Sequence, residues 1–216
     1  MRKTTLAAAV SLAVTTIASS VYADTIIEEV IVTAQKREQA ITDVALTVTA
    51  VSGEVARTMG VEDTRDVAML ATNVDIKGAG LADANPAITV RGIGMNNFNA
   101  NNNPSVGVYL DEVFLASPAM INLSMLDVGR IEVLKGPQGT LYGRNATGGA
   151  LNIISAKPTQ DLEGFASLTV GDYDTAKFEG AVSGGLTDSL SGRISVLWDS
   201  QGESYHEYFK DSGGKD

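Results

Sequence analysis

The feature that most constrains the fold of this chain is a glycine-rich segment enclosed by two apolar runs, within residues 129–158. The runs cover residues 131–134 and 150–154, and glycine stands between them at positions 136, 139, 143, 148 and 149. Short apolar runs bounded by turn residues are typical of buried strands. Glycine supplies positive φ angles and lets backbones approach closely. The segment therefore predicts two paired strands joined by a compact connection that reverses the direction of the chain.

The same glycines raise the alternative of a phosphate-binding loop. A Walker loop needs Lys followed by Ser or Thr directly after its last glycine, because these side chains contact the phosphates and Mg²⁺. Here Gly143 is followed by Arg-Asn, and Gly148 by Gly-Ala. The pattern therefore argues against nucleotide binding.

Three blocks of the sequence resemble, in the same order, parts of the plug domain of TonB-dependent outer-membrane receptors, the gated importers of Gram-negative bacteria. The blocks are ITVRGIG at residues 88–94, SVGVYLDEVF at 105–114 and RIEVLKGPQGTLYGRNATGGALNI at 130–153. The resemblance covers roughly residues 28–200. It implies an α+β plug domain, a small mixed sheet with short helices, followed by the first antiparallel strands of an incomplete transmembrane β-barrel.

The chain begins with the features of a secretory signal peptide at residues 1–23. Arg2 and Lys3 precede an apolar stretch at residues 6–18, and small residues lead to a cleavage point after Ala23. The alternative is an uncleaved anchor helix, although the apolar stretch is short for a membrane span. Either way we expect the chain to be exported.

The charge of the expected mature chain excludes one class of partner. The leader holds two of the 16 basic residues and none of the 26 acidic ones, so residues 24–216 carry a formal charge of −12. Such a balance disfavours nucleic acid and anionic lipid surfaces as partners. Cysteine is absent from the sequence, so the exported domain must depend on its core and sheet pairing rather than on disulfides.

Within residues 24–40, the segment EEVIVTA has a strand-like apolar core with charged flanks, and QKREQ, which follows it, has no core-building pattern. Such a segment can stay extended and mobile, then add to the sheet edge of a partner. It resembles a TonB box, which implies binding of the TonB-type energising protein of the inner membrane. An ordinary first strand of the domain is the alternative. The predicted partner-binding residues are Glu28, Glu29, Val30, Ile31, Val32, Thr33 and Ala34.

Residues 41–158 have the pattern of a small mixed domain, the predicted plug. Ser52 is a plausible N-cap for a short helix closed by Gly60, and Asp63 for a second one. At residues 111–112, where relatives typically have Asp-Gly, this chain has Asp-Glu, which is less comfortable in a primed hairpin turn. Strands are expected at residues 46–51, 74–77, 87–91 and 106–114, before the two of the glycine-rich segment.

An asparagine-rich loop separates two of these strands. Asn suits turns and its amide both donates and accepts hydrogen bonds, so the loop can be irregular and ligand-facing. In the resembling receptors it corresponds to an apical loop that faces the substrate, whereas a solvated linker is the alternative. The predicted substrate-facing residues are Asn96, Asn97, Phe98, Asn99 and Asn101.

Three charged residues stand among the apolar strand residues: Arg91, Arg130 and Glu132. A buried charge needs a partner, and no obvious partner lies near any of them in the sequence. In the resembling receptors the matching positions pair with charges on the barrel wall and latch the plug. The simpler interpretation is that they are exposed charges at strand ends.

Residues 159–216 change to long alternating strands. Each strand has an apolar face and a largely polar one, as in residues 190–199, where Ile194, Val196 and Trp198 oppose Arg193 and Ser195. A soluble sandwich would turn the apolar face inward and a membrane barrel would turn it outward, so the alternation alone leaves both open. The signal peptide and the plug resemblance favour the barrel, and therefore outer-membrane lipid as a partner.

Length limits how much barrel the chain can form. A plugged transporter barrel has about 22 strands, and only 53 residues of the 216 follow Glu163. We therefore expect three barrel strands and an N-terminal piece of a receptor, from a truncated gene model, a partial sequence or a pseudogene.

The sequence offers no catalytic or metal-binding set. His206 is the one histidine, it stands in a polar tail, and no cysteine accompanies it. We expect no enzyme and no cofactor. The resemblance implies uptake of a scarce small molecule, such as an iron–siderophore or another metal chelate, across the cell outer membrane. The alternatives are a soluble periplasmic ligand-binding module with the plug fold and a surface receptor that does not transport.

Overall fold

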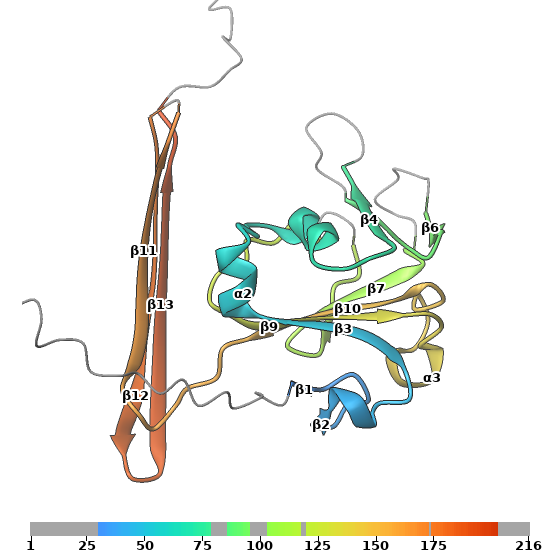
Figure 1. Ribbon diagram of the computed structural model, residues 1–216, viewed down its shortest axis with the longest axis horizontal. Helices are drawn as coiled ribbons and strands as arrows, with labels where there is room; N and C mark the ends of the chain where they lie inside the picture. The colour runs from blue at the N-terminus through green and yellow to red at the C-terminus, as the bar shows by residue number, and fades with distance from the viewer. Residues whose placement is uncertain (1–29, 79–85, 96–102, 118–119, 173, 203–216) are drawn as a thin grey trace, which may run out of the picture.

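The computed structural model describes residues 30–78, 86–95, 103–117, 120–172 and 174–202. The described chain forms an N-terminal domain, residues 30–158, beside an elongated C-terminal sheet, residues 163–200 (Figure 1). The predicted signal peptide, residues 1–23, lies outside the described residues. Within the described part of the chain, no helix is both long and apolar enough to cross a membrane.

A five-stranded sheet forms the centre of the N-terminal domain, in the order β3-β9-β10-β7-β8. β10 runs parallel to β7, and the other neighbouring pairs are antiparallel. The two apolar runs of the glycine-rich segment form its central strands, as predicted. The strands are β3 (Thr47–Ser52), β7 (Val106–Leu110), β8 (Val113–Phe114), β9 (Val128–Lys135) and β10 (Gly149–Ser155).

The connection between β9 and β10 depends on glycine. It contains the one-turn helix α3 (Gly139–Tyr142), and Gly136 and Gly143 have φ angles of 108° and 75°. Gly149 has φ 147°, and a Cβ there would lie 2.2 Å from the Leu134 carbonyl oxygen. A side chain at residue 149 would therefore push the two central strands apart.

One face of the five-stranded sheet is covered by helical turns and a second small sheet. Ser52 caps α2 (Gly53–Thr58), since its Oγ accepts a hydrogen bond from the Val55 N–H, and Gly60 follows the helix with φ 75°. Asp63 caps the second helical turn, η2 (Thr64–Met69), with a reciprocal capping box. The second sheet has the order β4 (Val74–Lys77), β5 (Ala87–Val90) and β6 (Ile93–Gly94). Both predicted caps are confirmed.

The opposite face of the five-stranded sheet is covered by an N-terminal hairpin, residues 31–40. Its strands β1 (Ile31–Val32) and β2 (Gln39–Ala40) pair antiparallel, and the short turn η1 (Ile41–Asp43) leads on to β3. The sheet thus has a separate hydrophobic cluster on each face, one with Ile131 and Val133 and the other with Val32 and Leu134. Burial on both faces explains why the central strands read as continuous apolar runs.

The hairpin turn between β7 and β8 keeps primed geometry without glycine. Asp111 and Glu112 have φ angles of 46° and 69°, as a type I′ turn requires at both central residues. The Asp111 carboxylate stabilises the turn, because it accepts hydrogen bonds from the Ser155 N–H at 2.9 Å and the Ser155 hydroxyl at 2.7 Å. The hairpin therefore has a primed turn, although Asp-Glu at residues 111–112 is an unfavourable sequence for one.

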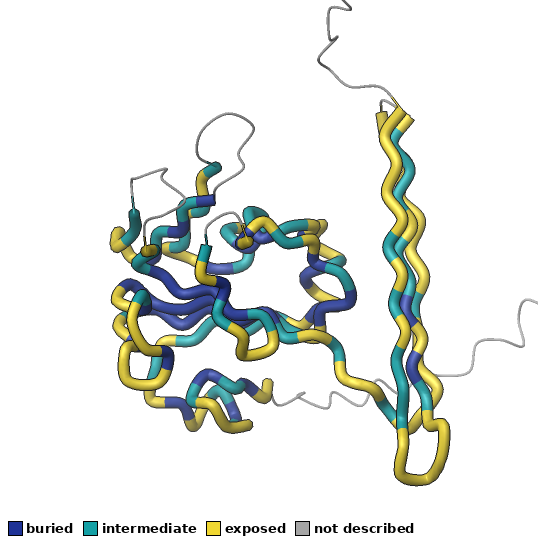
Figure 2. Tube along the Cα trace, turned by 180° about the vertical axis from the view of Figure 1, so that it is seen from behind, coloured by how far each residue is buried: buried dark blue, intermediate teal, exposed yellow. Residues whose placement is uncertain are grey.

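The C-terminal sheet contains three long antiparallel strands in sequence order (Figure 1). Figure 2 shows that most of its length is exposed or half-buried, in contrast to the buried centre of the N-terminal domain. Ile194, Val196 and Trp198 on its apolar face are all exposed, and Trp198 lies opposite Phe178. The strands are β11 (Glu163–Gly171), β12 (Thr175–Thr187) and β13 (Leu190–Ser200). The predicted fold class is confirmed.

Candidate functional site

The structure divides the predicted partner-binding segment into three parts. Glu28 and Glu29 lie outside the described residues. Val30 and Ile31 are exposed, by 43% and 41%, whereas Val32 and Ala34 are buried against the five-stranded sheet and Thr33 is half-buried. Part of the segment is thus available at the surface and part is docked as a first strand of the domain.

The docked part is held by apolar contacts and by tyrosine. Val32 and Ala34 are fully buried in the cluster that contains Leu134. The Tyr142 hydroxyl donates to the Ala34 carbonyl oxygen at 3.0 Å, and the Tyr109 hydroxyl donates to the Tyr142 carbonyl oxygen at 2.5 Å. Burial raises the pKa of both tyrosines above 10.0, because ionisation in this cluster would lose hydration.

Glu132 lies under the hairpin and is 0% exposed. Its Oε1 atom accepts from the Thr33 N–H at 2.7 Å, the Thr33 hydroxyl at 3.1 Å and the Arg130 Nε at 2.8 Å. Its Oε2 atom accepts from the Asn152 Nδ2 at 3.4 Å, and Arg130 also donates to the Thr33 hydroxyl at 3.1 Å. A buried carboxylate is therefore satisfied by donors from three segments of the chain, β9, β10 and the hairpin.

This arrangement corrects one expectation about the three charged strand residues. Arg130 and Glu132 pair with each other, so the expectation that neither has a partner near it in the sequence is wrong. Residues two apart on a strand share a face, and that spacing is the signal that was available. The predicted latch to a barrel wall stays a prediction for all three residues.

Arg91 lies outside the strand on which it was expected. β5 ends at Val90, and Arg91 occupies the following turn with φ 52° and an exposed side chain. Its guanidinium donates to the Lys135 carbonyl oxygen at 3.3 Å. Burial, and secondarily repulsion by Arg91, lowers the pKa of the Lys135 ammonium. Arg91 therefore does not belong to the Glu132 network.

The predicted substrate-facing residues belong to the asparagine-rich segment between β6 and β7. Asn96, Asn97, Phe98, Asn99 and Asn101 lie outside the described residues. The strands that flank the loop, β6 and β7, stand at the end of the domain opposite α2 in Figure 1. Among the described residues, no group of three or more His, Cys, Asp or Glu side chains could hold a metal ion.

The contact between the N-terminal domain and the C-terminal sheet is polar. Arg193 on β13 makes a bidentate pair with Asp127, with N–O distances of 2.7 and 2.5 Å. Lys177 on β12 pairs with Glu62 at 3.3 Å, and its side chain is largely buried, at 18% exposed. Asp127 was not among the predicted site residues, because its partner Arg193 lies 66 residues away in the sequence.

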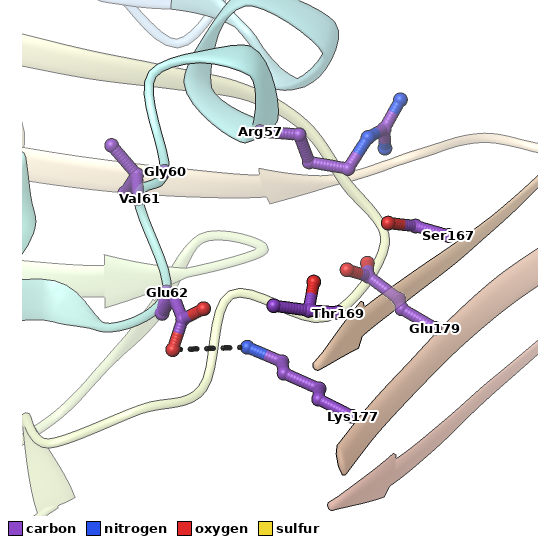
Figure 3. Close-up of a pocket in the computed structure, with 8 residues that line it drawn as sticks. All are labelled: Arg57, Gly60, Val61, Glu62, Ser167, Thr169, Lys177 and Glu179. Carbon is purple, nitrogen blue, oxygen red and sulfur yellow. Dashed lines mark ion pairs between the residues drawn. The ribbon is translucent and has the colours of Figure 1, made fainter. Parts of the chain in front are cut away.

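A polar cavity of ≈ 220 Å³ separates α2 from the C-terminal sheet (Figure 3). Next to it, the Arg57 guanidinium stacks over the Phe165 ring, 3.8 Å from its centroid. The cavity is lined by Arg57, Gly60, Val61, Glu62, Ser167, Thr169, Lys177 and Glu179. Its lining carries both signs of charge, and we assign it to the polar contact between the N-terminal domain and the C-terminal sheet.

Comparison with known proteins identifies the N-terminal domain. A family model described as TonB-dependent Receptor Plug Domain matches residues 40–150. The pesticin receptor of Yersinia pestis is 36% identical over 96 residues, which are 44% of this chain and 14% of that receptor. The vitamin B12 transporter BtuB of Photobacterium profundum is 30% identical over 200 residues, which are 91% of this chain and 32% of that transporter.

A solved receptor structure is also similar to this chain. The ferric yersiniabactin uptake receptor FyuA from Yersinia pestis matches 70% of this chain and 24% of its own, with a TM-score of 0.65 and 28% identity. The chain spans only between 11% and 32% of the length of the curated relatives it matches.

Proposed function

The chain belongs to the TonB-dependent receptor plug family, and from that premise we propose that it acts in the active uptake of a scarce small molecule across the cell outer membrane. The N-terminal domain is the plug, and the C-terminal sheet contributes strands to the wall around it. We propose the division into a leader at residues 1–23, a TonB-box segment at 24–40, a plug at 41–158 and barrel strands at 159–216. Transport rather than catalysis is the proposed activity.

One observation carries this proposal: the C-terminal sheet turns its polar face toward the plug and its apolar face outward. Arg193 and Lys177 reach Asp127 and Glu62 of the plug, while the apolar side chains of the opposite face are exposed. A soluble sandwich gains stability by burying that face, whereas a membrane barrel presents it to lipid. The orientation supports a receptor wall over a soluble periplasmic binding module.

The proposed substrates are metal chelates, with iron–siderophores as the leading class. This follows the names of relatives, which include a ferripyoverdine receptor of Pseudomonas aeruginosa and the catecholate siderophore receptor Fiu of Escherichia coli. Vitamin B12 is the alternative that the BtuB relative supports. We propose that the asparagine-rich loop at residues 96–101 faces the substrate.

The proposed energising partner is a TonB-type protein that binds residues 28–34 by strand addition. Main-chain hydrogen bonds provide affinity in this mode, and Val30 and Ile31 already offer exposed apolar side chains. Photo-crosslinking of the chain to the periplasmic domain of such a protein tests this. Ile31→Pro removes a ladder donor and should abolish the crosslink, while Thr25→Pro, outside the segment, should keep it. Equal crosslinking of the Ile31→Pro chain would reject the assignment.

The wall orientation has its own test because Trp198 is the only tryptophan of the chain. Refolded into vesicles, the chain should show quenching of Trp198 emission by brominated lipids, since the indole lies on the outward apolar face. Phe178→Ala opposite Trp198 should preserve the quenching. Emission that brominated lipids leave unchanged would mean that protein covers this face, as in a soluble module.

A further inference from the structure

Each strand of the C-terminal sheet contacts the plug through a side chain on its inner face. We propose that these contacts give the plug a second role: it is a template that sets the register in which β11, β12 and β13 pair. This role concerns how the sheet forms, and it does not depend on uptake. The template surface of the plug consists of Arg57, Glu62 and Asp127, which contact Phe165 on β11, Lys177 on β12 and Arg193 on β13.

The sequence of the C-terminal sheet specifies its register only weakly. Its strands contain glycine at positions 164, 171, 180, 184, 185 and 192, and glycine has no side chain to pair across strands. Side chains alternate with a period of two, so a shift of two residues leaves each one on its own face. Ile194, Val196 and Trp198 would still point outward after such a shift. The apolar outer face therefore rejects a shift of one residue but not a shift of two.

The turn between β12 and β13 does not fix the register by itself. Moving a hairpin turn by one residue along the chain changes the pairing of its two strands by two residues. The pairing is irregular beside this turn, between Gly185 and Thr187, whereas residues 176–185 pair regularly with residues 191–200. Regular pairing beyond the irregularity indicates a constraint farther along the strands, where the template surface lies.

The pair between Arg193 and Asp127 is the most selective of the three contacts. It is bidentate, and the two side chains are 13% and 9% exposed. A planar guanidinium fits a carboxylate in few orientations, so this contact requires one position of Arg193. A shift of two residues would move Arg193 by about 7 Å along the strand. It would leave the buried Asp127 carboxylate without its charged partner, which is costly.

Asp127 contacts two neighbouring strands at once. Its carboxylate binds Arg193 on β13, and its N–H donates to the Glu179 Oε1 atom on β12 at 3.3 Å. The Asp127 carbonyl oxygen accepts from the Ala156 N–H at 2.9 Å, which fixes the residue within the plug. One plug residue thus holds two strands in a single relative position. The offset between neighbouring strands sets the stagger of a barrel, so an error in the first strands would be passed to those that follow.

Disulfide formation between β12 and β13 measures the register directly, because the chain has no cysteine of its own. Val182→Cys with Ile194→Cys reports the observed register, in which these two residues are opposite each other. Val182→Cys with Val196→Cys reports a shift of two residues. All three positions lie on the outer face, away from the template surface. In the 216-residue chain refolded into vesicles, the first disulfide should form at least about tenfold faster than the second.

Asp127→Asn tests the template in both cysteine backgrounds. It removes the charge but keeps the shape, and asparagine tolerates the φ of 49° at this position. We expect it to reduce the ratio of the two rates at least about fivefold, and Arg193→Gln should do the same from the sheet side. Asp75→Asn is the matched control, because Asp75 is an exposed plug residue that pairs locally with Lys77. It should change the ratio less than about twofold.

Each outcome decides for or against the template. An unchanged ratio in both Asp127→Asn and Arg193→Gln would overturn it, and so would an equal fall in Asp75→Asn. Loss of both disulfides would also reject it, because the pair would then hold the sheet together without selecting its register. Hydrogen exchange at the Leu151 amide shows whether the plug stays folded, and if Asp127→Asn exposes it, Arg193→Gln decides. Quenching of Trp198 by brominated lipids tests the proposed wall separately, so either proposal can fail alone.

Discussion

The two faces of the five-stranded plug sheet are covered in different ways. On one face, apolar side chains of β9 and β10, such as Ile131 and Leu151, meet α2, η2 and the second sheet. On the other face, the N-terminal hairpin covers Leu134 together with Glu132, which needs donors from the hairpin itself. Strand β9 contributes to both faces in alternation.

The difference indicates that the cover of α2, η2 and the second sheet stays in place, whereas the N-terminal hairpin can detach. Separating two apolar layers exposes surface to water with no compensation, and the loss grows with area. Separating the hairpin also exposes apolar surface, but its polar groups recover hydrogen bonds to water. The first face should therefore open only with global unfolding, and the second through a smaller local opening.

The largest effect is expected from the sealed face. Leu151 is almost completely buried there, and Leu151→Ala should lower the free energy of unfolding by about 2–5 kcal/mol through lost burial and a cavity. Leu168→Ala, on the exposed face of β11, is the matched control and should change it little. Urea denaturation measures both. A near-neutral Leu151→Ala would show that this face is not sealed.

The next effect concerns the charged pair on the hairpin face. Arg130→Ala leaves the buried Glu132 carboxylate without its charged donor, and should cost up to about 3 kcal/mol in unfolding free energy. Adding Glu132→Gln to Arg130→Ala should recover part of that loss, which a double-mutant cycle measures. Additive losses in the cycle would contradict a direct interaction between the two side chains.

A smaller effect is expected from the tyrosine that supports the hairpin. Tyr142→Phe removes the donor to the Ala34 carbonyl and the acceptor for Asn152, at a cost of about 1–2 kcal/mol. The pH dependence follows from the raised pKa of Tyr142, chiefly through burial. Its contribution is complete below the unfolded pKa near 10.0 and is lost as pH rises through the folded pKa.

Thermal denaturation between pH 8 and about 11 tests this dependence. The difference between native chain and Tyr142→Phe should shrink as pH rises past the unfolded value, and groups common to both chains cancel in that difference. A gap that widens with pH would show that the phenolate, not the phenol, is the stabilised form.

The smallest effect belongs to the surface of the hairpin. The exposed Lys157 ammonium, which hydrogen-bonds Glu38, lowers the pKa of that carboxyl. Glu38→Gln should nevertheless leave the unfolding midpoint unchanged at physiological salt, because exposed pairs are screened and flexible. A clear drop in the midpoint would mean that surface charge, not the buried carboxylate, holds the hairpin.

Much of the fold could be predicted because it depends on local patterns. The apolar runs of β9 and β10, the Ser52 and Asp63 caps and the alternation of the C-terminal strands are all set by residues close in sequence. The direction of the apolar face in the C-terminal sheet was not set locally, because alternation is the same for either orientation. Only the pairs with Asp127 and Glu62 decide it.

The candidate site was less predictable because its contacts are distant. Thr33 meets Glu132 across 99 residues, and Arg193 meets Asp127 across 66. The segment EEVIVTA predicted strand character correctly but not that its second half is buried. The Arg130–Glu132 pair could have been predicted, because residues two apart on a strand share a face. The contact between Glu132 and Thr33 could not, because it depends on how the hairpin packs against the sheet.

Native-state hydrogen exchange across the whole chain tests the central claim most directly, because it gives an opening free energy for each amide. We predict that the amides of Val32 and Thr33 open at a clearly lower free energy than those of Ile131 and Leu151, which should share the global value. Equal opening free energies in the hairpin and on both central strands would contradict the account, since the hairpin would then leave only when the plug unfolds.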